Sequence, residues 1–79
     1  SRMPQVGTIA ITPEGRGTII ETFTLREAVK VKVRLEDGSD DIFQFKISEI
    51  EITDEMDPAY LKPSEIAENA DRIADIDKQ

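Results

Sequence analysis

Cysteine, histidine and tryptophan are all absent from this chain of 79 residues. Without cysteine the chain forms neither a disulfide nor a thiolate zinc site, and it gives no sign of an oxidising compartment. Without histidine it lacks the commonest general base and metal ligand, so Ser-His-Asp and Cys-His catalytic groups cannot be built from it. We therefore expect a protein that is not an enzyme and that holds no metal or cofactor.

Long apolar runs are also missing. The longest stretches of consecutive apolar residues, such as Ile9-Ala10-Ile11, have three members. A membrane-spanning helix needs about 20 mostly apolar residues, and no secretory signal is visible at the start of the chain. We expect no association with a membrane and, by elimination, a cytoplasmic location.

Basic residues are outnumbered, and the net charge is −7. Residues 1–53 carry nine acidic and seven basic side chains, whereas residues 54–79 carry eight acidic and three basic ones. Such a chain repels phosphate backbones at long range, which disfavours nonspecific binding of nucleic acids. The change in composition divides the chain into a β-rich domain over residues 1–53 and an acidic tail over residues 54–79.

Alternating apolar and polar residues predict strands in the first part of the chain. Residues 29–35 and 42–47 both place apolar side chains at every second position, as in a strand with one buried face. Asp37-Gly38 between them is a strong signal for an antiparallel hairpin. The inward side chains of the two strands are Val29, Val31, Val33, Leu35, Phe43, Phe45 and Ile47.

Three further strands complete the predicted sheet. Residues 6–11 form a first strand, and Pro13 then begins a turn. Residues 18–25 form a second strand whose imperfect alternation predicts a bend or bulge near Ile20 and which supplies Phe23 and Leu25 as apolar groups. Residues 50–52 close the sheet as a short fifth strand. This spacing is typical of a small all-β barrel.

The acidic tail is predicted to be helical. Asp57 and Pro58 are suited to the cap and first position of a single helical turn, and Ser64 can cap a longer helix through about Asp77. The apolar stripe of this helix is thin and mostly alanine, so the helix needs a surface to lie on. That surface is its own barrel, a second copy of the chain or another protein.

Three segments carry a resemblance to known proteins: Thr12-Pro13-Glu14-Gly15-Arg16-Gly17-Thr18-Ile19, Val31-Lys32-Val33-Arg34-Leu35-Glu36-Asp37-Gly38 and Ile47-Ser48-Glu49-Ile50. The pattern resembles the C-terminal segment of bacterial RicT/YaaT-type proteins and, more loosely, KOW and Tudor-like barrels, including the C-terminal domain of repair helicases. Over residues 12–52 it implies a partly open, five-stranded SH3-like barrel with a docking role, often within transcription or RNA-processing assemblies. Iron–sulfur chemistry does not carry over, because this chain has no cysteine. The predicted fold is therefore mainly β: a small five-stranded SH3-like antiparallel barrel with a C-terminal α-helix.

The candidate binding residues are basic or aromatic: Arg16, Lys30, Lys32, Arg34, Lys46 and Tyr60. The cations form a strip that can contact phosphates or an acidic peptide. Alternatively, they are a solvated face whose charges prevent pairing between sheet edges, or a surface on which the acidic tail folds. Tyr60 either anchors a partner or plugs the open end of the barrel. The phenylalanines are all assigned to the core and Tyr60 lies in the tail, so the strip lacks the exposed aromatic rings that nucleic-acid barrels use for base stacking.

Two other motifs have ordinary structural interpretations. Gly15-Arg16-Gly17 precedes a strand and not a helix, so we expect a turn with positive φ in place of a phosphate-binding loop. Asp37, Asp40 and Asp41 lack the spacing of an EF-hand calcium loop and are expected to form a solvated hairpin tip.

We therefore expect a noncatalytic protein-interaction module whose partner is another protein, or a second copy bound through the C-terminal helix. The alternative is a small barrel that binds RNA or DNA through the face of Lys30, Lys32 and Arg34.

Overall fold

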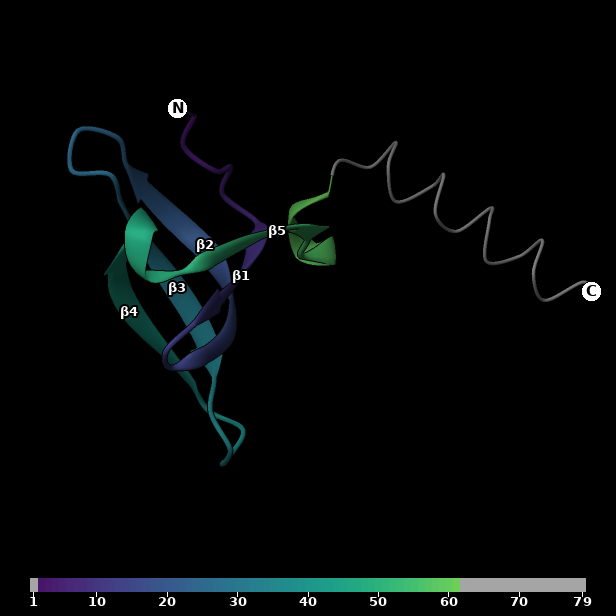
Figure 1. Cartoon of the computed structure of the whole chain (residues 1–79). Coiled ribbons are helices and arrows are strands. Elements are labelled where there is room, and N and C mark those ends of the chain that lie inside the picture. Colours follow the sequence, from purple (N-terminus) through teal and green to yellow (C-terminus); the bar gives the residue numbers. More distant parts are fainter. Residues whose placement is uncertain (1, 62–79) are drawn as a thin grey trace, which may run out of the picture.

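The computed structural model of the chain describes residues 2–61. These residues form five strands and two short 3-10 helices (Figure 1). In chain order the elements are β1 (Thr8–Thr12), β2 (Gly15–Phe23), β3 (Ala28–Arg34), β4 (Asp40–Lys46), η1 (Ile47–Glu49), β5 (Glu51–Met56) and η2 (Pro58–Tyr60). All strand pairs are antiparallel, in the order β4-β3-β2-β1-β5. The prediction of a mainly β domain with five antiparallel strands is confirmed.

The sheet formed by residues 2–61 is not closed into a barrel, so that part of the prediction is wrong. β4 and β5 are the two edges of the sheet and do not pair with each other. η1 separates them, and its first residue, Ile47, donates its N–H to the Glu27 carbonyl next to β3 at 2.9 Å. β5 then crosses to β1 (Figure 1). Ile47 and Ile50 pack against the core in this gap, where closure would require another strand ladder.

The core covers one face of the central strands, as the alternation predicts. Val29, Val31 and Val33 are each exposed by 1% or less, and Phe45, paired with Val29, is exposed by 8%. Phe43 is partly buried and lies 6.2 Å from Phe45 between ring centroids. Burial of these side chains supplies most of the driving force for folding, because it removes apolar area from water.

The bulge predicted near Ile20 is present, and it reverses which face of the sheet the later side chains of β2 occupy. The β2–β3 register shifts between the pair Ile19↔Val31 and the pair Glu21↔Lys30. One extra residue in a strand sends all later side chains to the opposite face. Phe23 therefore lies on the outer, charged face of the sheet, and its assignment to the core is wrong.

Leu25 is also not a core residue. β2 ends at Phe23, and Leu25 lies in the turn that follows, where it is exposed by 101%. The turn is closed by a hydrogen bond from Glu27 N–H to the Thr24 carbonyl at 3.1 Å. Glu27 adopts a φ of 50°, the left-handed region that usually favours glycine.

Gly15 and Gly17 are required for different reasons. Gly15 has the positive φ (125°) that the turn was predicted to need. At Gly17 the requirement is space, because an added Cβ would lie 2.5 Å from the Lys32 carbonyl oxygen and under 3 Å from methyl groups of Val31 and Val33. The close approach of β2 to β3 therefore excludes a side chain at this position.

The single turn predicted after residue 56 is confirmed as η2. Asp57 caps it, accepting a hydrogen bond from Ala59 N–H at 2.9 Å, and Pro58 occupies its first position. Residues 2–61 contain no α-helix, and the helix predicted from Ser64 to Asp77 lies outside the described residues. None of the helices in the described part of the chain is long and apolar enough to cross a membrane.

Candidate interaction surface

The predicted basic strip lies on the outer face of the sheet, opposite the buried valines. Across β2 and β3, Thr18 pairs with Lys32 and Glu21 pairs with Lys30. Because residues alternate along β3, Lys30, Lys32 and Arg34 share this face. The alternation along β3 was therefore sufficient to place the three cations on one face. Which side chains lie next to them depends on the register between strands.

Most cations of the outer face have an acidic neighbour on another strand. The ion pairs are Arg16 Nη2 with Glu55 Oε2 at 2.8 Å, Arg34 Nε with Asp40 Oδ1 at 2.7 Å and Lys30 Nζ with Glu21 Oε1 at 3.8 Å. The hydrogen bond to Asp40 also raises the pKa of Arg34. Such exposed pairs add little stability, but they place opposite charges side by side. The outer face therefore carries both signs of charge.

Lys32 borders a shallow polar hollow of about 190 Å³ near the middle of this face. Asp57 lines the same hollow and accepts a hydrogen bond from the Thr18 hydroxyl at 2.9 Å. The N–H of Ala59, the Thr18 hydroxyl and the positive charge of Lys32 together lower the pKa of Asp57. This carboxylate joins η2 to β2, which is a structural role.

Tyr60 and Lys46 lie away from the central cations. Tyr60 belongs to η2 and is exposed by 41%, with its Cβ against Gly7, where an added Cβ would be 2.5 Å away. Lys46 ends β4 and pairs with Ala28 at the start of β3. The six residues predicted from the sequence therefore do not form one site.

A different set of side chains gathers around the turn between β2 and β3. The Arg26 guanidinium lies over the Phe23 ring at 4.2 Å from its centroid, and Lys30 Nζ lies 5.8 Å from the same ring. Phe23, Ala28 and Lys46 form one row across β2, β3 and β4. We call Phe23, Leu25, Arg26 and Lys46 the loop-end surface.

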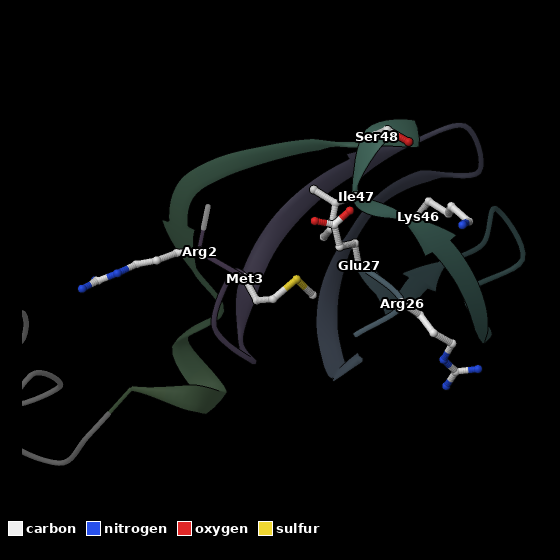
Figure 2. Close-up of a pocket in the computed structure, with 7 residues that line it drawn as sticks. All are labelled: Arg2, Met3, Arg26, Glu27, Lys46, Ile47 and Ser48. Atoms are coloured by element: carbon white, nitrogen blue, oxygen red, sulfur yellow. The ribbon is translucent and has the colours of Figure 1, made fainter. Parts of the chain in front are cut away.

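One hollow at the loop-end surface, of about 280 Å³, is lined by Phe23, Thr24, Leu25 and Arg26. Two further hollows border the surface, and both are lined by Arg26, Glu27 and Lys46. The first measures about 270 Å³ and lies between the turn, η1 and Met3 (Figure 2). The second measures about 450 Å³, and its lining also includes Leu25, Ala28, Gln44, Phe45 and Glu49. Figure 2 shows the Lys46 side chain beside η1 and the Arg26 side chain extending downward from the turn, while the Glu27 side chain points away from Arg26.

Arg26 and Lys46 differ from the paired cations of the outer face. Within residues 2–61, no carboxylate lies within ion-pairing distance of either side chain. Glu49 is nearby, but its Oε1 accepts the backbone N–H of Lys46 at 2.8 Å. The loop-end surface therefore combines an exposed aliphatic side chain, a ring and two cations without a carboxylate partner in the described residues.

The carboxylates of the β3–β4 hairpin are engaged separately. Asp37 accepts hydrogen bonds from the Ser39 hydroxyl at 2.6 Å and the Ser39 N–H at 3.0 Å, which lower the pKa of Asp37. Asp40 binds Arg34, and Asp41 accepts the Ile42 N–H at 2.8 Å. Among residues 2–61 no group of three or more acidic side chains is arranged to hold a metal ion.

Sequence reasoning missed Phe23 and Leu25 as surface residues. The available signal was the broken alternation at Ile20, which predicts a change of face for the residues after it. No family model matches the chain, and comparison with curated proteins and with solved structures found no significant match.

Proposed function

We propose that this domain is a noncatalytic protein-interaction module of the SH3-like type, and that the loop-end surface is where it docks. The SH3-like assignment is supported by the order of features that the family resemblance implies. A glycine-containing turn leads into β2, which bends at its bulge, and the Asp37-Gly38 hairpin follows. The strands then continue into η1, whose first residue, Ile47, packs against the core.

The exposure of Leu25 is the observation that carries the proposal. Leu25 is exposed by 101% at the tip of a tight turn, beside a Phe23 ring that is only partly buried. Aromatic and arginine side chains are enriched among the residues that dominate binding energy in protein interfaces. Arg26 stacked on Phe23 provides both at the edge of a hollow.

Binding of RNA or DNA is the second candidate, and one observation favours it. Phe23 lies on the outer face with Arg26 and Lys30 beside it, and single-strand binders combine aromatic platforms with cations. Against it, Lys30 has Glu21 as a neighbour, and the chain has a net charge of −7. A protein partner therefore accounts better for the whole surface.

Site-specific photo-crosslinking in the cells of origin tests the proposed function. The full chain would carry a benzophenone amino acid in place of Leu25, with a matched control in place of Glu36, which is exposed in the hairpin at the other end of the sheet. We expect protease-sensitive adducts from position 25 and few from position 36. Nuclease-sensitive adducts would support the second candidate, and equal labelling at both positions would contradict docking at the loop end.

A further inference from the structure

We infer that the loop-end surface binds a peptide segment in which an acidic side chain adjoins an apolar one. The carboxylate would bond to Arg26, Lys46 would add a second positive charge at the same hollow, and the apolar side chain would lie against Leu25. This inference rests on the proposed function and adds the chemistry of the partner.

The two cations supply the charge complementarity. Arg16, Lys30 and Arg34 each have a carboxylate within 4 Å, whereas Arg26 and Lys46 have none among residues 2–61. Lys32 has none within that distance either, but it lines the same hollow as the Asp57 carboxylate. An incoming carboxylate at the loop end therefore displaces no ion pair formed among residues 2–61. Charge-assisted hydrogen bonds from guanidinium and ammonium groups are among the stronger polar contacts in proteins.

The arginine is held in place before any partner arrives. Its guanidinium lies 4.2 Å from the Phe23 ring centroid, and this cation–π contact favours one orientation of the side chain. A side chain that is already oriented loses less conformational entropy on binding. Arg26 is therefore the better anchor of the two cations.

The backbone on both sides of the hollow is also fixed. The turn is closed by Glu27 N–H to the Thr24 carbonyl at 3.1 Å, and η1 is tied to the turn by Ile47 N–H to the Glu27 carbonyl at 2.9 Å. The hollow between them, about 450 Å³, has Leu25 and Ala28 on its apolar side. This hollow is open to solvent and has room for a peptide side chain.

A peptide fits this surface better than a single-stranded nucleic acid. Base stacking needs an open ring face, and one face of Phe23 is covered by Arg26. Tyr60 lies on η2, away from the loop end, so it does not add a second ring for stacking there. A carboxylate and one apolar side chain match the groups that the loop-end surface presents.

Nuclear magnetic resonance titration of the isotope-labelled full chain tests the inference. The ligands are two short peptides of equal length that differ only in Glu or Gln beside a leucine, together with an oligothymidine. We expect the Glu peptide to shift the amide signals of Leu25, Arg26 and Lys46, and to bind roughly tenfold more tightly than the Gln peptide. Arg26→Gln should abolish most of that preference, and Lys46→Gln should reduce it.

Lys32→Gln is the matched control, because it removes the same charge from the middle of the same face. It should change the affinity by no more than about twofold. Each variant must keep the wild-type amide spectrum away from its own site, and Arg26→Lys provides a second test because it keeps the charge without the planar fork. Arg26→Lys should bind more weakly than the wild type and more tightly than Arg26→Gln.

Equal affinity for the Glu and Gln peptides, an equal loss in Lys32→Gln and Arg26→Gln, or tighter binding of oligothymidine would overturn the inference. Shifts centred on η2 would overturn the proposed location. If neither peptide binds while position 25 still crosslinks to protein, the proposed function stands and the acidic character of the partner is refuted.

Discussion

Replacing Gly17 with alanine should be the most damaging single-methyl change in the sheet. The added Cβ would lie 2.5 Å from the Lys32 carbonyl oxygen, 2.7 Å from Val31 Cγ1 and 2.9 Å from Val33 Cγ2. Ordinary contacts begin near 3.4 Å, so β3 would have to move by nearly 1 Å. Both valines are buried and hold the centre of the core, which leaves them little freedom to move.

The expected cost follows from the cost of overpacking. Inserting atoms into a well-packed core typically lowers the free energy of unfolding by about 1–3 kcal/mol. We expect Gly17→Ala to lie near the upper end of this range, because its Cβ clashes with the backbone as well as with side chains. Domains of this size have a total stability of roughly 3–9 kcal/mol. For a small domain about 1 kcal/mol lowers the melting temperature by roughly 4–8 °C, so we expect a decrease of about 10–25 °C.

Thermal unfolding followed by circular dichroism measures this decrease, with Gly38→Ala as the matched control. Gly38 has a φ of 87°, and an added Cβ there would meet nothing within 4 Å. Gly38→Ala therefore introduces backbone strain without a steric clash, at a cost of about 1–2 kcal/mol, whereas Gly17→Ala introduces the clash. A Gly17→Ala protein that melts at or above the wild-type temperature, or above the Gly38→Ala protein, would refute the close approach of β2 and β3.

Four further substitutions test other parts of the structure. Phe45→Ala should lower the free energy of unfolding by about 3–5 kcal/mol because the ring belongs to the core. Phe23→Ala, on the outer face, should lower it clearly less. Equal losses of stability in chemical denaturation would contradict the change of face at the bulge. Glu27→Gly should leave stability unchanged or raise it by about 0.5–1 kcal/mol because φ at that position is positive, and a lower melting temperature would show that the Glu27 side chain is needed. Asp57→Asn should destabilise the protein at neutral pH. Folding lowers the pKa of Asp57, so the stability that its carboxylate contributes is present above the unfolded pKa of about 3.9 and is lost as the pH falls through the folded value. The melting temperatures of the wild type and Asp57→Asn should therefore converge in acid. A difference between them that is independent of pH would contradict a role for the charge.

Local chemistry made several parts of the fold predictable. The valines of β3 alternate with cations, so their burial followed from the period of a strand. The Asp37-Gly38 turn fixed the hairpin, and Asp57 beside Pro58 fixed the cap of η2. Each of these features depends on residues that are close together in the chain.

The candidate surface was less predictable because it depends on pairing between strands. The bulge at Ile20 was expected, but its effect on Phe23 becomes clear only when Phe23 is paired with Ala28 on β3. The ion pair of Arg16 with Glu55 joins residues 39 positions apart. Which cations form ion pairs with carboxylates therefore depends on contacts between distant residues, which no local sequence pattern describes.

The sequence by itself determined the strands, the tight turns and the inward valines, because side-chain alternation and glycine or proline conformation act over a few residues. The tertiary structure alone decided that the sheet stays open between β4 and β5 and that Arg26 and Phe23 meet at the loop end. The physical reason is that strand register and edge pairing are set by packing among distant segments. A shift of one residue along a strand exchanges its buried face for its exposed one.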